Sequence, residues 1–341
     1  MQPINNTLIL LFLSLMATSG VARSNNSNEN DGTPNYNADS TWSWGGIFGA
    51  NFSQVAIGEY WAAGGLSSYS VNTILNFNVG YKKKKVSFDN SINIGYGMIK
   101  QGEKSALSSQ EWLKSDDKLE FTSKLGYQIK GEKLSISGLV NFKSQAAPGF
   151  NYPNETTLTS NFLAPGYLVF GGGIDYKPNA SLSLFLAPIS SGKITFVHDQ
   201  KLADAGSFGV QPAERNESGE IIKPGARYRA EFGGFLRIVY KKENLSDNSE
   251  SPLNDISFQS NIDLFSNYLN SPENIDVNVG LLLGMKVNKY ISVTISANAI
   301  YDHDTSFKII ERDGDGNETG FHLGPRLQIK EVLGVGFSYK F

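Results

Sequence analysis

Long stretches of this sequence alternate between apolar and polar residues with a period of two. In one of them Ile291, Val293 and Ile295 alternate with Ser292 and Thr294. Successive side chains of a β-strand point to opposite faces, so each stretch would have one apolar and one polar face. The stretches are longer than a typical globular strand of about five or six residues. We therefore predict an all-β chain built from unusually long strands.

The alternation predicts twelve strands. They are expected at residues 44–55, 69–82, 84–99, 117–130, 132–146, 166–178, 180–198, 227–242, 253–267, 272–288, 290–304 and 329–341. The stretch 180–198 contains Pro188 and Gly192 and could be two short strands, but we predict one kinked strand. We also predict that Gly171–Gly173 is a tight, crowded position in the wall formed by the sixth strand.

The connections between these strands differ in length in a regular way. Tight turns are predicted at 82–84, 130–132, 177–179 and 288–289, and long loops near 100–116, 147–165, 199–226 and 305–328. In an up-and-down barrel every second connection lies on the same side, so twelve strands place all the long loops together. Outer-membrane barrels have short periplasmic turns and long outer loops. The fold predicted is thus a single up-and-down transmembrane β-barrel of about 12 antiparallel strands.

Tyrosines lie near both ends of the predicted strands, on the face that carries the aliphatic residues. The short-turn group is Tyr81, Tyr127, Tyr240 and Tyr339, and the long-loop group is Tyr96, Tyr228, Tyr268 and Tyr301. The separation of Tyr228 and Tyr240 along a tilted strand corresponds to about 30 Å, the thickness of a bilayer's hydrocarbon core. Such aromatic girdles are typical of membrane barrels.

Alternation alone leaves the direction of the two faces open. In a soluble barrel of the lipocalin type the apolar face points inward and the polar face outward, whereas a membrane barrel has the reverse arrangement. A soluble periplasmic binding barrel is therefore the alternative to the membrane fold.

The two ends of the sequence suggest an export route. Residues 1–22 are predicted to be a signal peptide, with an apolar stretch from Leu8 to Ala22, although no Lys or Arg precedes it. Residues 23–41 are expected to form a disordered polar leader, and 42–341 the barrel. The last strand alternates and ends on an aromatic residue, which resembles the signal read by the outer-membrane assembly machinery. That predicted assembly signal comprises Leu333, Val335, Phe337, Tyr339 and Phe341.

Composition excludes several classes of function. The formal net charge is −3 and the basic residues are spread along the chain, so no nucleic-acid partner is expected. The sequence contains no cysteine, which excludes disulfides, thiolate catalysis and an acylated cysteine anchor. After residue 22 no apolar run approaches the roughly 18 residues of a membrane-spanning helix.

Charged residues on the polar parity are the candidates for a site inside the barrel. These predicted lumen-lining residues are Glu120, Lys124, Arg229, Glu231, Arg237, Asp263, Asp276 and Lys286. A hairpin centred between Leu269 and Asn270, or one step on, would place Asp263 and Asp276 almost opposite each other, and two facing carboxylates need a cation or a shared proton. Two interpretations remain open: a salt-bridge network that fills and rigidifies a narrow barrel, or a constriction selecting small polar or cationic solutes.

Catalytic and metal motifs are weak. The segment Asp302–His303–Asp304 is similar to the acid and histidine pairs of outer-membrane proteases, but parity points the acids inward and the histidine outward. The acidic segment Asp313–Glu318 lacks the residues that complete a calcium-binding EF-hand. We predict no catalytic residues, no metal site and no cofactor.

Several local motifs resemble a family of outer-membrane proteins from Bacteroidota-type bacteria that is catalogued as a domain of unknown function. The resemblance extends from about Trp42 to Phe341. Its motifs include Asn51–Gln54, Trp61–Gly65, Lys114–Lys118, Pro148–Pro153, Phe162–Pro165, Leu202–Gly206, Asp263–Tyr268, Met285–Tyr290 and Lys330–Gly334. It implies an outer-membrane address and a barrel, and leaves the activity open.

The function predicted is a narrow channel, transporter or binding barrel for a small solute in the outer membrane of a Gram-negative bacterium, not an enzyme. The alternatives are an outer-membrane hydrolase acting at the outer rim and a structural scaffold. Expected partners are outer-membrane lipid, the barrel assembly machinery and an unidentified small solute.

Overall fold

The computed structural model of the protein describes residues 42–57, 65–102, 107, 110–152, 154–288, 290–313 and 317–340. The predicted signal peptide and polar leader, together with Phe341, lie outside these residues and remain predictions. The fold described below is that of the unit that contains residues 42–340.

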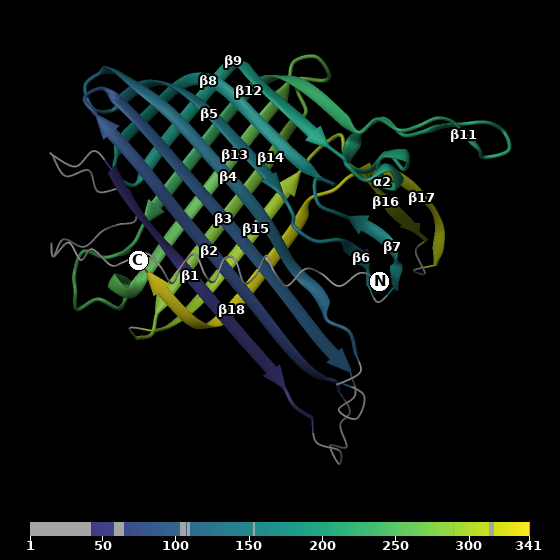
Figure 1. Cartoon of the computed structure of the whole chain (residues 1–341), viewed down its shortest axis with the longest axis horizontal. Helices are drawn as coiled ribbons and strands as arrows, with labels where there is room; N and C mark the ends of the chain where they lie inside the picture. Colours follow the sequence, from purple (N-terminus) through teal and green to yellow (C-terminus); the bar gives the residue numbers. More distant parts are fainter. Residues whose placement is uncertain are drawn as a thin grey trace. The chain divides into compact units, whose positions relative to one another are not determined.

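Twelve antiparallel strands close into a barrel, as the sequence predicted (Figure 1). Each strand pairs with its neighbours in the order β1-β18-β15-β14-β13-β12-β9-β8-β5-β4-β3-β2. The strands are β1 (Trp42–Val55), β2 (Ser67–Lys83), β3 (Val86–Gly102), β4 (Leu113–Lys130), β5 (Leu134–Ser144), β8 (Gly166–Asn179), β9 (Leu182–Phe196), β12 (Tyr228–Lys242), β13 (Ile256–Asn267), β14 (Ile275–Lys286), β15 (Ile291–Tyr301) and β18 (Gln328–Lys340).

The long connections all lie on one side of the barrel, which confirms the parity argument (Figure 1). They contain secondary structure that the sequence had not predicted, because short hairpins in polar segments carry little periodic signal. These elements are the hairpins β6 (Gly149–Asn151) with β7 (Asn154–Ser160), β10 (Glu214–Arg215) with β11 (Ile221–Lys223), and β16 (Ser306–Arg312) with β17 (Glu318–Pro325), and the short helices α2 (Gln200–Asp204) and η1 (Ser207–Gly209). On the short-turn side, η2 (Pro252–Asp255) lies between β12 and β13.

Within the described residues, no helix has both the length and the apolar character needed to cross a membrane.

The strand β9 is continuous through Pro188, as predicted. Its register with β12 shifts from Ser191 opposite Gly233 to Ala187 opposite Phe235, so the extra residues of β9 form a bulge. The bulge of β9 packs closely against β8, at positions where glycine leaves the space that a side chain would need. A Cβ atom placed on Gly173 would lie 2.1 Å from the carbonyl oxygen of Leu186. Gly171 is also crowded, whereas Gly172 has open space, so two of the three predicted glycines are crowded wall positions.

Burial in this barrel is the reverse of that in a soluble barrel. Large apolar side chains point outward and are exposed, such as Leu125 at 55% and Ile136 at 57%. Charged side chains point inward and are buried, with Glu120 at 2% and Asp263 at 8% exposure. A lipocalin-type barrel would have apolar residues inside. The soluble-barrel alternative is therefore wrong on the direction of its two faces.

Most tyrosines of the two predicted girdles lie at or near strand ends, whereas Tyr96 lies well inside β3 (Val86–Gly102). Tyr127, Tyr228 and Tyr339 are more than half exposed on the outer surface. Tyr268 lies one position past β13 and donates its hydroxyl hydrogen to the carbonyl oxygen of Pro188 at 2.6 Å.

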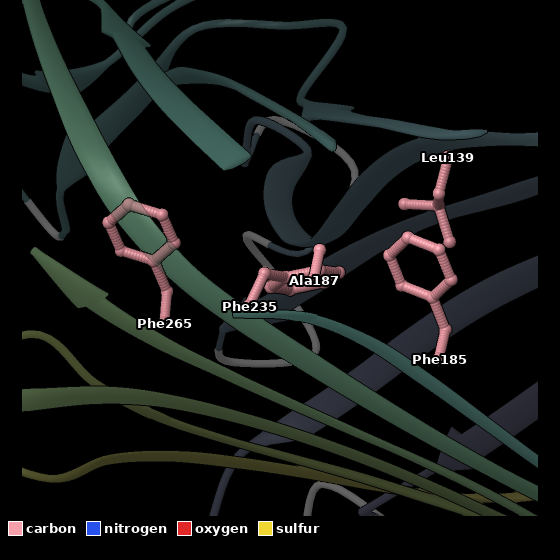
Figure 2. Close-up of a cluster of buried hydrophobic side chains, with 5 residues drawn as sticks. All are labelled: Leu139, Phe185, Ala187, Phe235 and Phe265. Carbon is pink, nitrogen blue, oxygen red and sulfur yellow. The ribbon is translucent and has the colours of Figure 1, made fainter. Parts of the chain in front are cut away.

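One group of apolar side chains packs inside the barrel against the strands that contain the bulge. We call it the lumen apolar cluster, and it consists of Leu139, Phe185, Ala187, Phe235 and Phe265, all nearly fully buried (Figure 2). The rings of Phe185 and Phe235 are 6.2 Å apart, and Val169 packs against the group. These residues come from β5, β9, β12 and β13, with Val169 on β8, so the cluster fills the lumen along one wall only.

Candidate functional site in the barrel lumen

Inward-pointing charges at mid-height form a network that we call the middle cluster. Its members are Lys118, Glu120, Lys143, Arg237 and Asp263. Lys143 Nζ lies 2.9 Å from Asp263 Oδ2, and Arg237 Nη2 lies 3.6 Å from Glu120 Oε1. The Asn141 amide donates to Glu120 Oε1 at 3.1 Å. These ion pairs satisfy charges that would be costly to bury alone.

The middle cluster crosses the lumen instead of following the wall. Lys143 lies on β5 and Asp263 on β13, and β8, β9 and β12 separate these strands around the barrel. The second link likewise joins Arg237 on β12 to Glu120 on β4. Both ion pairs therefore span the wall segment whose inner face carries the lumen apolar cluster. Together the two groups fill this side of the lumen.

A second network lies nearer the long loops and is called the outer cluster here. It comprises Lys193, Arg229, Glu231, Asp276, Asp302 and Asp304. Lys193 Nζ lies 3.0 Å from Asp302 Oδ2, and it also pairs with Asp276. Arg229 lies 3.0 Å from Glu231 through Nη2 and 3.0 Å from Asp304 through Nη1. Four carboxylates thus share two cations.

Lys124 belongs to a third, smaller group near the short turns. Its Nζ atom lies 2.8 Å from Asp175 Oδ2 and 3.1 Å from the Ser183 hydroxyl oxygen. Lys177 bridges the neighbouring carboxylates, at 3.1 Å from Asp89 and 3.9 Å from Asp175. The charges of this group are also paired.

Seven of the eight predicted lumen-lining residues belong to these three groups, and the eighth belongs to none. Lys286 is exposed at the end of β14. The predicted near-opposition of Asp263 and Asp276 holds only approximately: Asp263 faces Asn278 and Asp276 faces Phe265, so the two acids are offset by two residues. The hairpin is centred between Asn270 and Ser271, and each of the two acids has its own lysine partner.

The decisive cations Lys143 and Lys193 were missed from the sequence. Lys143 has the inward parity of its strand, and that signal could have revealed it. Lys193 follows the bulge at Pro188, which interrupts the alternation and hides the parity. Asp302, considered only as part of a protease-like motif, is 7% exposed and bound to Lys193. Partners on non-neighbouring strands cannot be read from periodicity.

Two large cavities lie in the lumen among the described residues. The first has a volume of about 520 Å³ and extends from the short turns to the middle cluster. The second, of about 450 Å³, extends from the middle cluster toward Lys193 and Asp302. Both are lined by Glu120, Lys118 and Lys330, so they meet at the level of the middle cluster.

The first cavity is lined on one side by uncharged polar residues of β2, β3 and β15. They include Asn76, Asn78, Ser91, Asn93, Ser296 and Asn298. Asn78 donates to Asn76 at 2.6 Å, and Asn76 donates in turn to Asn93 on the facing strand. Amides offer both donors and acceptors, so this wall can bind polar groups of either kind. Ile74 and Leu282 add apolar patches to the same cavity.

The long loops include an ordered core of their own. Ala164, Val197, Leu202, Ala203 and Val210 are buried together. The Asp199 side chain caps α2 by accepting from the backbone N–H groups of its first turn.

Asp204 ties two parts of this loop region together. Its Oδ1 atom accepts from the Gly225 backbone N–H at 2.8 Å and from the Gln200 amide at 2.6 Å. The hydrogen bond from Gly225, followed by that from Gln200, lowers the pKa of the Asp204 carboxyl below its ordinary value. The ionised carboxylate of Asp204 therefore joins α2 to the segment that leads into β12.

The weak motifs of the sequence do not assemble into a reactive group. The carboxylates of Asp302 and Asp304 lie 3.0 Å from Lys193 and Arg229, and His303 Nδ1 lies 3.5 Å from the Tyr301 hydroxyl. Among the described residues there is no set of three or more acidic or histidine side chains arranged to hold a metal ion. Residues 314–316 of the calcium-like segment lie outside the described part of the chain.

Comparison with known proteins adds a family match for one part of the chain. Residues 52–150 match a family described as "Protein of unknown function (DUF3078)". This match agrees with the resemblance to a domain of unknown function and covers the segment from β1 to β6. A search of curated proteins finds no match.

Several solved structures have a related course of the chain at low identity. An outer membrane channel from Pseudomonas putida F1 is 10% identical, with 92% of this chain and 100% of that chain covered and a TM-score of 0.36. The toluene transporter TodX of P. putida is 12% identical, with 89% and 80% covered and a TM-score of 0.31. The NanC porin is 10% identical, with 86% and 98% covered and a TM-score of 0.31. These scores carry no argument about function, and the barrel is established by its own strand pairing.

Proposed function

We propose that the protein is an integral outer-membrane barrel of a Gram-negative bacterium that admits or binds a small solute in its lumen. The observation that carries the proposal is the reversed burial. Charged side chains such as Glu120 are buried inside, while apolar side chains such as Leu125 cover the outside. Only a lipid environment makes this arrangement favourable, because a bilayer solvates the outer apolar band.

The residual lumen supports a role with small solutes. Two cavities of about 520 and 450 Å³ meet at the middle cluster, and each is comparable to a pocket for a small molecule. The cations and carboxylates of the middle cluster neutralise one another to within one charge, so size and polarity would decide passage more than net charge. The middle cluster is the constriction in this proposal, replacing the facing pair of acids.

The proposed partners follow from the outer surface. Outer-membrane lipid contacts the exposed apolar band, and the barrel assembly machinery reads the last strand. On that strand Leu333, Val335, Phe337 and Tyr339 all point outward and are exposed. The motif resemblance favours a source among Bacteroidota-type bacteria. No nucleic-acid partner is proposed.

The proposed role is not enzymatic. The carboxylates nearest the predicted rim site, Asp302 and Asp304, are held by Lys193 and Arg229 and are poorly placed to activate a water or a nucleophile. Alanine substitution of Asp302, His303 and Asp304 should therefore remove no hydrolytic activity on peptides or lipids.

Membrane insertion can be tested first on the mature protein. We expect it to require detergent for solubility and to migrate differently on gels before and after heating, as folded membrane barrels do. A protein that stays in aqueous solution without detergent and lacks this shift would refute the membrane assignment.

Passage through the lumen can be tested by single-channel recording in planar bilayers. We expect small, discrete conductance steps whose ion selectivity changes when Asp263 is replaced. Electrical silence of a correctly inserted barrel would leave a binding or scaffold role and exclude the channel.

A further inference from the structure

The seam between the first and last strands is paired over only part of its length. The register of β1 and β18 runs from Ile47 opposite Lys340 to Asn51 opposite Gly336. Continued, it would place Phe52 opposite Val335 and Val55 opposite Val332. These residues pair only with β2 and β15 respectively, and no described strand occupies the space between them. At about 3.3 Å per residue, about 13 Å of the β1 edge (residues 52–55) and about 26 Å of the β18 edge (residues 328–335) are thus unpaired across the seam.

The two strands diverge where their pairing stops. In Figure 1 the purple β1 and the yellow β18 meet near the carboxyl end of the chain and separate toward their long-loop ends. The neighbouring strand pairs on either side of the seam, β1–β2 and β15–β18, keep their pairing along these residues. The split therefore lies in the wall itself, on the half of the seam nearer the long loops.

The last paired row of the seam is closed by small residues and one amide. A Cβ atom on Gly336 would lie 2.3 Å from the Ala50 carbonyl oxygen, and one on Gly334 would lie 2.3 Å from Asn51 Nδ2. Asn51 thus covers the inner side of both glycines.

One ion pair spans the inner side of the split. The transverse row of Asn51 continues through Asn72 and Gly97 to Asp116 on β4. Asp116 accepts a hydrogen bond from the Asn72 amide at 3.4 Å and forms an ion pair with Lys330 of β18. Since β1, β2 and β3 lie between β18 and β4 in the barrel order, the Lys330–Asp116 pair bridges the lumen behind the open seam.

The first cavity reaches this ion pair. Asp116 and Lys330 are both part of its lining, as are the amides of the polar wall and the apolar side chains of Ile74 and Leu282. The cavity offers contacts to a polar group and to an apolar body at once. On the outside of the split, Phe52 and Val335 are exposed toward the lipid. The unpaired backbone groups between them would be costly in dry hydrocarbon, so they need water from the lumen.

We propose that the split between β1 and β18 is a lateral portal through which a single-chain amphiphile moves between the first cavity and the bilayer. The Lys330–Asp116 ion pair is its inner gate. The inference rests on the proposed membrane function and extends it, since it names the class of solute and a route that bypasses the outer cluster.

The chain contains no cysteine, so the portal can be locked and probed in the natural background. A disulfide between F52C and V335C would pin the split closed. A disulfide between F48C and Y339C is the matched control, because Phe48 and Tyr339 are paired in the register and outward-facing. Each locked barrel then carries a bimane fluorophore on S91C, which lines the first cavity. Reconstituted vesicles receive a nitroxide-labelled fatty acid as the probe.

We expect the fatty acid to quench the bimane saturably in the control disulfide barrel, and the F52C–V335C lock to remove most of that quenching. D116N in the control barrel should increase the quenching, because it releases Lys330. Equal quenching in both locked barrels would overturn the portal, since the probe would then enter by the barrel mouths. A nitroxide-labelled phospholipid can replace the fatty acid as the probe. If it quenches the bimane without reaching saturation, the assignment of a single-chain amphiphile as the solute would be overturned. Ion conductance should be the same in the two disulfide-locked barrels, so the proposed channel is tested separately from the portal.

Discussion

The two halves of the lumen wall differ in almost every property. The wall of β5, β8, β9, β12 and β13 carries the lumen apolar cluster, and the middle cluster spans it. Among the described residues, the wall of β1, β2, β3, β14, β15 and β18 lacks such a cluster, and its asparagine, serine and glycine residues line one side of the first cavity. We call them the filled wall and the open wall. The difference teaches that one side of the barrel contributes most of the internal packing while the other leaves room for a solute.

The largest expected effect concerns packing in the filled wall. F235A should lower the free energy of unfolding by about 3–5 kcal/mol, because it leaves a cavity in a closely packed cluster. F232A, on the same strand but facing outward at 45% exposure, is the control and should cost less because lipid can fill the space. Denaturant unfolding in lipid vesicles measures both. Equal losses would mean that the lumen apolar cluster does not stabilise the barrel.

The next effect concerns the middle cluster. D263N leaves Lys143 and Arg237 without their shared carboxylate, and breaking a buried pair costs about 3 kcal/mol. The lumen also gains positive charge, so ion selectivity should move toward anions. The control D247N removes an exposed carboxylate on a short turn and should change neither property. An unchanged reversal potential in D263N would contradict the assignment of the constriction.

In the open wall, a substitution should change conductance strongly and stability only slightly. N93F places an aromatic ring in the first cavity and should reduce conductance strongly, while the lost amide hydrogen bond costs only about 1 kcal/mol. I92F adds the same ring one position away on the outward face and serves as the control. Conductance of N93F equal to that of the unmodified barrel would mean that solutes avoid this wall.

The smallest effect concerns the long loops, outside the comparison of walls. The lowered pKa of Asp204 means that its stabilising contribution is present above the ordinary aspartate pKa of about 3.9 and is lost as the pH falls through the lowered value. Limited proteolysis of residues 199–226 should therefore accelerate at acidic pH. D204N should be cleaved readily at neutral pH and show little further change on acidification. Equal cleavage of both proteins at neutral pH would show that Asp204 does not order the loop.

Much of the architecture could be predicted from the sequence because it depends on local periodicity. Alternation located the strands, and the loop lengths indicated which side each turn occupies. The register across a hairpin was harder, as Asp263 and Asp276 show, because one residue of turn length changes every partner. The ion pairs were hardest, since Lys143 and Asp263 are far apart in sequence and on non-neighbouring strands.

The sequence by itself determined the strand count, the two faces of each strand and the inward parity of most charged residues, since a period of two is a property of the chain alone. The fold in three dimensions was needed to show that the charges meet in three separate groups, and that one wall is filled while the seam of β1 and β18 splits. The physical reason is closure: bending twelve strands into a ring brings distant residues across one narrow lumen, and periodicity contains no information about that distance.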